Sequence, residues 1–140
     1  MDEIEELNAY CRNSMISFLG ITFTKIHSGG IQATMPVDSK TCQPGGLLHG
    51  GASLALAESL AGAGSYLLID RDKYNVLGLQ VSGNHLATTG PGMLFGDAKL
   101  IHQGNTTHVW EVKISREDNK LISLVRVTNI ITDNQKKENQ

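Results

Sequence analysis

The amino-acid sequence predicts an α+β domain in which one strongly curved antiparallel β-sheet wraps around a single long central helix. Three observations support this fold. A run near the middle of the chain is apolar or small almost all round, as in a buried helix. Segments before and after it alternate apolar and polar side chains, as strands do. Short turn signals between the later segments favour antiparallel pairing. A wrapped sheet can cover such a helix on most sides.

The N-terminal part predicts a short helix, a hairpin and a loop. Residues 3–17 carry apolar side chains at helical spacing, namely Ile4, Leu7, Cys11 and Met15. Residues 21–27 and 31–37 alternate apolar and polar side chains around a Ser-Gly-Gly sequence, which is a hairpin signal. Residues 38–48 contain a proline followed by two glycines and are predicted to form a loop.

The central helix is predicted over residues 50–68, and four strands are predicted after it, at 76–86, 92–102, 107–115 and 121–132. The turn signals between these strands are Thr-Gly-Pro-Gly, Gly-Asn and Glu-Asp-Asn. Residues 1–132 are therefore expected to form a single domain, which is long enough to bury a hydrophobic core. Residues 133–140 are polar and are expected to form a tail.

Composition and charge argue against several classes of function. A net charge of −2 leaves no basic surface for nucleic acid. The acidic N-terminus does not resemble a signal peptide, and no apolar run is long enough to span a membrane, so a cytoplasmic protein is expected. Cys11 and Cys42 lack metal-type spacing and are predicted to be free thiols. The histidines are scattered, so no metal site and no cofactor are predicted.

Glu58 is the exception within the apolar helix and the leading candidate for chemistry. Its neighbours at i±3 and i±4 are apolar residues or glycine: Leu54, Ala55, Ala61 and Gly62. A carboxylate buried among such residues is costly unless it is paired or functional. The other interpretation is a glutamate on a narrow solvated stripe. Small residues share its face: Gly51, Ala55, Gly62 and Ser65. They would let a ligand or a second backbone approach the helix.

The start of the same helix has the features of an oxyanion hole. The amides of Gly50 and Gly51 lie in the first turn, where no preceding turn supplies an acceptor, at the positive end of the helix dipole. Without side chains, both residues would let a carbonyl oxygen come close. A plain glycine-rich helix entry would look similar, but the glutamate farther along this helix favours the catalytic interpretation.

Other polar residues near this helix are candidates for binding. His49 could donate to a bound oxygen or cap the helix. Gln43 could orient a carbonyl or lie solvated in its loop. His85 follows Gly-Asn at the end of a predicted strand. The turn formed by Gly104, Asn105 and Thr106 could direct amides at a phosphate, or it could be an ordinary hairpin turn.

The sequence QPGGLLHGGASLALAES at residues 43–59 closely resembles the active-site region of the 4-hydroxybenzoyl-CoA thioesterase branch of the hotdog superfamily. Within this branch the chain is similar to the 1,4-dihydroxy-2-naphthoyl-CoA and enterobactin proofreading thioesterases. The similarity extends through ATMPVD, GLQVSGNHL and the Gly-Asn-Thr turn to the last strand, and so covers nearly the whole chain. The spacing from the glutamine through His-Gly-Gly to the glutamate is specific.

The resemblance implies a role for each matching residue. Glu58 corresponds to the catalytic carboxylate of the family, and Gly50 to the glycine whose amide polarises the thioester carbonyl, with Gly51 beside it in the substrate site. Gln43 and His49 correspond to residues that orient the carbonyl and the sulfur. His85 corresponds to a residue near the acyl pocket and the pantetheine arm, and the 104–106 turn to a loop that touches the CoA nucleotide.

Two positions depart from the family pattern. The hydroxyl residue expected four positions after the glutamate is replaced by Gly62, and Ser59 and Ser65 have the wrong spacing to stand in for it on that face. The nucleotide loop reads Gly104-Asn105-Thr106, where relatives often carry arginines.

The resemblance therefore implies a hotdog-fold acyl-CoA thioesterase acting on an aromatic acyl-CoA, for which 1,4-dihydroxy-2-naphthoyl-CoA is a candidate. Coenzyme A enters as part of the substrate, and Glu58 acts as nucleophile or general base. Dimerisation is expected, because a single sheet around one helix leaves part of the helix and the sheet edges exposed. The homodimer is expected to share its active sites and to assemble as a dimer of dimers, a homotetramer.

Two other functions fit the sequence less well. A hotdog dehydratase or isomerase acting on acyl thioesters would use a carboxylate and a histidine, but Gln43 would then have no obvious purpose. A non-catalytic acyl-CoA sensor would need an output domain, and only about twenty residues precede the first strand, too few for a helix-turn-helix.

Overall fold

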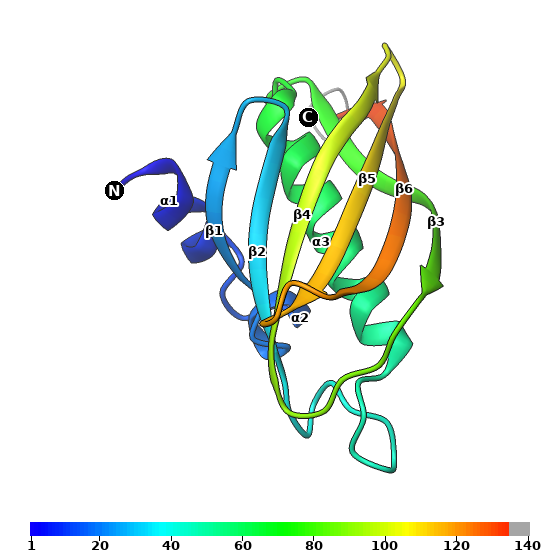
Figure 1. Ribbon diagram of the computed structural model, residues 1–140. Coiled ribbons are helices and arrows are strands. Elements are labelled where there is room, and N and C mark those ends of the chain that lie inside the picture. Colours follow the sequence, from blue (N-terminus) through cyan, green and yellow to red (C-terminus); the bar gives the residue numbers. More distant parts are fainter. Residues whose placement is uncertain (135–140) are drawn as a thin grey trace.

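A computed structural model describes residues 1–134 of the protein (Figure 1). The helices are α1 (Glu3–Tyr10), α2 (Met15–Phe18) and α3 (Gly50–Leu68). The strands are β1 (Thr22–His27), β2 (Gly30–Val37), β3 (Tyr74–His85), β4 (Gly92–Gln103), β5 (Thr107–Arg116) and β6 (Leu121–Asp133). The polar tail predicted at 133–140 lies outside the described residues from position 135 onward.

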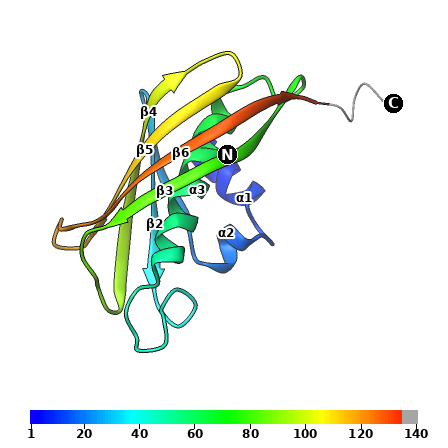
Figure 2. The same cartoon turned by 90° about the vertical axis from the view of Figure 1, so that its right-hand side faces the viewer.

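The strands of residues 1–134 form one antiparallel sheet in the order β1-β2-β4-β5-β6-β3. The sheet curves around α3, and α1 and α2 lie on the side of α3 that faces away from the sheet (Figures 1 and 2). β1 and β3 are the two edge strands. The predicted α+β fold, with a curved sheet around one central helix, is confirmed.

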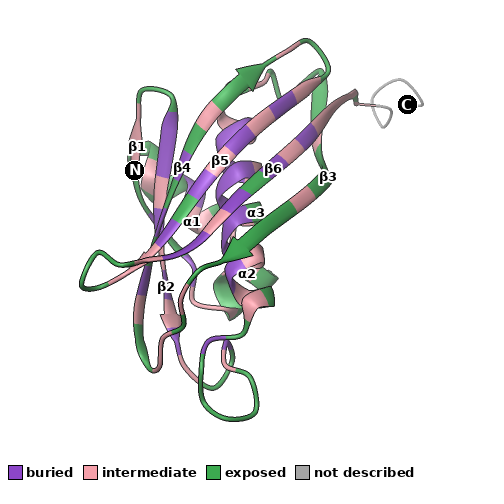
Figure 3. Cartoon of the chain, turned by 45° about the vertical axis from the view of Figure 1, so that its right-hand side comes forward, coloured by how far each residue is buried: buried purple, intermediate pink, exposed green. Residues whose placement is uncertain are grey.

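The core lies between α3 and the concave face of the sheet. Leu56 and Leu60 of α3 are completely buried, and the buried positions of β4, β5 and β6 alternate with intermediate or exposed ones along most of each strand (Figure 3). The helix lies close to the sheet because it carries small residues. A Cβ added at Gly64 would lie only 2.5 Å from Cη2 of Trp110, so this close approach requires glycine.

A buried polar network fixes the rotation of α3 against the sheet. Ser65 Oγ accepts hydrogen bonds from Trp110 Nε1 (2.9 Å) and Asn129 Nδ2 (3.1 Å), and it lies 2.8 Å from Nδ1 of His108. Ser65 therefore donates its own proton to a neutral imidazole, and burial lowers the pKa of His108 accordingly. Ser65 is therefore buried against the sheet, whereas Glu58, seven residues earlier in the helix, is exposed.

The single N-terminal helix predicted over residues 3–17 is instead two short helices. Asn13 adopts a positive φ of 61°, which interrupts the helical backbone after α1. Ser14 is then the N-cap of α2, and its amide donates to Ser17 Oγ at 3.3 Å. The apolar residues at helical spacing continue across this break. Met15, the last of them, is 63% exposed and is not part of the core.

Other expectations from composition can be compared with the described residues. Cys11 and Cys42 are both free thiols. No helix in residues 1–134 combines the length and apolar character needed to cross a membrane. Over the same residues, no three His, Cys, Asp or Glu side chains gather as ligands for a metal ion.

Candidate active site

The loop before α3 is held in shape by its own backbone. The Gln43 amide donates to the carbonyl of Leu47 (2.8 Å), and the Gln43 carbonyl accepts from the amides of Gly45 and Gly46 (3.0 Å each). The His49 amide donates to the carbonyl of a threonine at the other end of the loop (2.9 Å). Gln43 therefore has a defined position just before the N-terminus of α3.

The first turn of α3 presents one free amide, not two. His49 is the N-cap, and its Nδ1 accepts a hydrogen bond from the Gly51 amide at 2.8 Å. The Gly50 amide has no acceptor within residues 1–134. A neutral His49 that accepts at Nδ1 carries its proton on Nε2, where it can donate to a bound oxygen. The Gly50 amide is therefore free to act as an oxyanion donor, a role that stays a prediction, whereas the Gly51 amide is already occupied.

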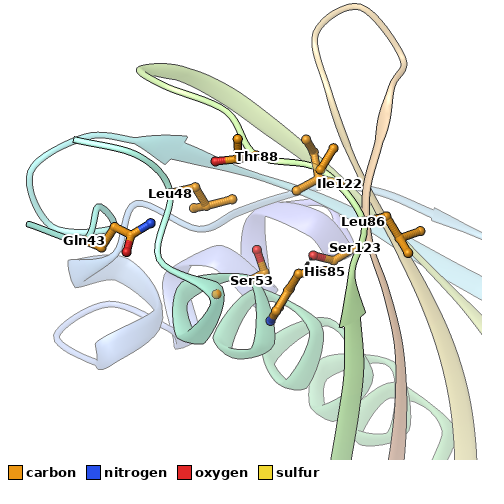
Figure 4. Close-up of a pocket in the computed structure, with 10 residues that line it drawn as sticks. Gln43, Leu48, Ser53, His85, Leu86, Thr88, Ile122 and Ser123 are labelled. Carbon is orange, nitrogen blue, oxygen red and sulfur yellow. Dashed lines mark hydrogen bonds between the residues drawn. The ribbon is translucent and has the colours of Figure 1, made fainter. Parts of the chain in front are cut away.

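Gln43, Gly50 and His85 line one pocket of about 350 Å³ beside the start of α3 (Figure 4). The other lining residues come from α3, the end of the loop and the ends of two strands: Leu48, Ser53, Leu86, Ala87, Thr88, Ile122 and Ser123. His85 Nδ1 lies 2.7 Å from Ser123 Oγ, which orients the ring. A Cβ added to Gly50 would lie 2.7 Å from His85 Nε2, so glycine makes room for the imidazole.

Glu58 lies away from this pocket, and its predicted burial is wrong for the single chain. The side chain is exposed and lines an open apolar groove of about 580 Å³ between α2 and α3. Its Oε2 would be 3.3 Å from a Cβ added at Gly78 of β3. The apolar neighbours that suggested burial, Leu54 and Ala55, are themselves half-buried and line the same groove.

No hydroxyl of α3 replaces the one absent at Gly62. A Cβ added there meets nothing within 4 Å, so the position is open beside Glu58. Ser59 donates its hydroxyl to the carbonyl of Ala55 at 2.7 Å, and Ser65 is committed to the buried network.

The turn at Gly104, Asn105 and Thr106 lies far from the pocket of its own chain. It joins β4 to β5, and β4 begins beside the last residue of β2, next to the loop that precedes α3. The turn is therefore a full twelve-residue strand away from that loop. Its predicted contact with the CoA nucleotide stays a prediction.

The prediction from sequence missed three polar residues of the pocket, Ser53, Thr88 and Ser123. Ser53 lies three residues after Gly50, a spacing that puts both on one face of a helix and could have identified it. In the sequence it stands among apolar and small residues and carries no charge, so it attracts less notice than Glu58.

Known proteins resemble this chain over nearly its whole length. The profile of the thioesterase superfamily matches residues 45–123. The 1,4-dihydroxy-2-naphthoyl-CoA hydrolase of Escherichia coli is 41% identical, over 91% of this chain and 93% of the hydrolase. The proofreading thioesterase EntH of Cronobacter sakazakii is 38% identical, over 91% of this chain and 93% of EntH. The crystal structure of a mutant thioesterase from Pseudomonas aeruginosa superposes with a TM-score of 0.92. The two chains are 43% identical, and the match covers 95% of this chain and 96% of the other.

Proposed function

This chain belongs to the thioesterase superfamily and is a thioester hydrolase, and from that premise we propose that its substrate is an aromatic acyl-CoA. The observation that supports thioester hydrolysis at this site is the free Gly50 amide at the start of a 19-residue helix, in one pocket with Gln43 and His85. The names of two relatives, a dihydroxynaphthoyl-CoA hydrolase and a proofreading thioesterase, support the aromatic acyl group.

In the proposed reaction the thioester carbonyl accepts a hydrogen bond from the Gly50 amide. This bond strengthens as negative charge develops on the oxygen, and the dipole of α3 adds to it. Gln43 and the Nε2–H of His49 are donors near the same helix end and can orient the carbonyl and the sulfur. No metal ion or organic cofactor takes part in this scheme.

Glu58 supplies the attacking group in one of two ways. In one route its carboxylate attacks the carbonyl carbon directly, expelling the CoA thiolate and leaving a mixed anhydride that water then hydrolyses. In the other route it takes a proton from a water molecule as that water attacks, and the proton then leaves with the thiol. Both routes give free CoA and the carboxylic acid.

The site is proposed to form between two copies of the chain. Gly50 and Glu58 are eight residues apart, roughly 12 Å along the helix axis, and within one chain they line separate hollows. The β3 edge beside Glu58 carries exposed leucines, Leu77 (55%) and Leu79 (58%). Pairing along this edge would cover them and bring the α3 N-terminus of a second copy toward Glu58.

Gly50→Ala should lower kcat/KM by about a hundredfold, because a shift of the reacting groups by about 1 Å costs that much. The added Cβ would lie 2.7 Å from His85 Nε2 and would displace either the imidazole or the carbonyl from the amide. Steady-state thiol release measures the loss. Gly45→Ala is the matched control in the preceding loop, since a Cβ there meets nothing within 4 Å. Equal activity of the two variants would argue against carbonyl binding at Gly50.

Thiol release over a panel of acyl-CoAs tests the proposed function itself. 1,4-Dihydroxy-2-naphthoyl-CoA and benzoyl-CoA should exceed long-chain fatty acyl-CoAs in kcat/KM. Palmitoyl-CoA as the best substrate, by about tenfold or more, would refute the aromatic assignment, since a hydrophobic pocket discriminates by such factors. Interconversion of enoyl- and 3-hydroxyacyl-CoA without thiol release would refute hydrolysis altogether.

A further inference from the structure

Ser53 has a buried hydroxyl that the fold itself does not satisfy. The residue is 1% exposed, and its Oγ is the one buried side-chain oxygen or nitrogen within residues 1–134 that lacks a hydrogen-bond partner. Burying an unpaired hydroxyl is costly, and native structures pair nearly all such groups. The group therefore needs an explanation that the folded chain alone does not give.

Other serines of α3 show that the helix can satisfy a hydroxyl. Ser59 donates to the carbonyl four residues earlier at 2.7 Å, the usual solution for a serine inside a helix. Ser65 has three polar partners at 2.8–3.1 Å. Ser53 forms neither kind of bond and lines the pocket that holds the free Gly50 amide.

The surroundings of Ser53 are those of an acyl-binding pocket. Its side chain points away from α3 into the space bounded by Leu48 and Ile122 (Figure 4). Gly50 lies one turn earlier, about 4.5 Å along the helix axis. A group that contacts Ser53 while its thioester oxygen is bound at Gly50 therefore lies several bonds from the reacting carbon, beside Leu48 and Ile122.

We infer that Ser53 is a specificity-determining residue that forms a hydrogen bond with a hydroxyl substituent on the acyl group of the substrate. This inference rests on the proposed thioesterase function and deepens it, because it assigns the residue that recognises a hydroxyl on the acyl group. A hydroxyl both donates and accepts, as Ser53 does, so the two can pair in either direction. A site built to pair with a substrate hydroxyl rejects the analogue that lacks it.

The test compares benzoyl-CoA with 2-, 3- and 4-hydroxybenzoyl-CoA as substrates of the wild-type protein and of Ser53→Ala. The wild type should prefer at least one hydroxylated substrate to benzoyl-CoA by about tenfold or more in kcat/KM, the discrimination that one buried polar pair can give. Ser53→Ala should abolish that preference while leaving kcat/KM for benzoyl-CoA within about threefold, because the lost bond involves only the substituent. Ser115→Ala, at a half-buried serine of β5 that does not line the pocket, should leave the ratio unchanged.

Each other outcome is decisive. An equal loss of kcat/KM on all four substrates would mean that Ser53 acts at the thioester, which they share, and would overturn the inference. An unchanged ratio in Ser53→Ala, or no wild-type preference for any hydroxylated substrate, would overturn it as well. In all three cases hydrolysis by the wild type leaves the proposed function intact. Absence of thiol release from every acyl-CoA would instead refute that function itself.

Discussion

Glu58→Gln should lower kcat by about 10²- to 10⁴-fold with KM little changed, the range that a general base contributes. Glutamine keeps the shape of the side chain but can neither attack the carbonyl nor take a proton from water. Binding of the acyl-CoA depends on other groups, so the loss should appear in kcat and equally in kcat/KM. Steady-state hydrolysis with a thiol reagent gives both constants.

The fold should survive this substitution unchanged. Glu58 is exposed in the single chain, so the stability gain that follows removal of a buried charge is not expected from the chain alone. Glu6→Gln in α1 is a suitable control, because that carboxylate is also exposed and lies on a helix outside the site. Near-wild-type turnover by a folded Glu58→Gln protein would refute the mechanism.

Most of the fold could be predicted from local patterns. α3 begins and ends at the predicted residues, because its apolar run starts at two glycines after a proline-containing loop. β3 starts two residues earlier than predicted and ends one residue earlier, and β4, β5 and β6 agree within one residue at each end. Alternation and turn residues determine such boundaries through contacts that are local in sequence.

The site was less predictable, because its properties depend on packing between distant segments. The apolar neighbours of Glu58 suggested burial, but a sequence does not say whether the same chain covers them. Here they line an open groove against α2. The amides of Gly50 and Gly51 look equivalent in sequence, and only the conformation of His49 distinguishes them. Ser53 acquires significance only once the hydrogen bonds of its neighbours are known.

Mixing two inactive variants should restore activity if the sites are shared. Glu58→Ala and Gln43→Ala are each expected to be impaired as homodimers, because every site then lacks one residue. After unfolding and refolding together, a mixed dimer has one site with both residues and one with neither. With random pairing about half of the dimers are mixed, so roughly a quarter of wild-type activity should return. Thiol release from the best acyl-CoA of the panel measures the recovery.

In a second mixture the shared-site model predicts that mixed dimers lose activity instead of regaining it. This mixture also controls for incomplete refolding. The wild type is mixed with the double variant that carries both Glu58→Ala and Gln43→Ala. If each site takes Gln43 from one chain and Glu58 from the other, every site of a mixed dimer lacks one residue. Only wild-type dimers then act, and about a quarter of the activity remains. If each chain holds a complete site, about half remains, and the two single variants never complement each other. A tag on one parent shows that mixed dimers form, so the two mixtures together decide between a shared site and a site within one chain.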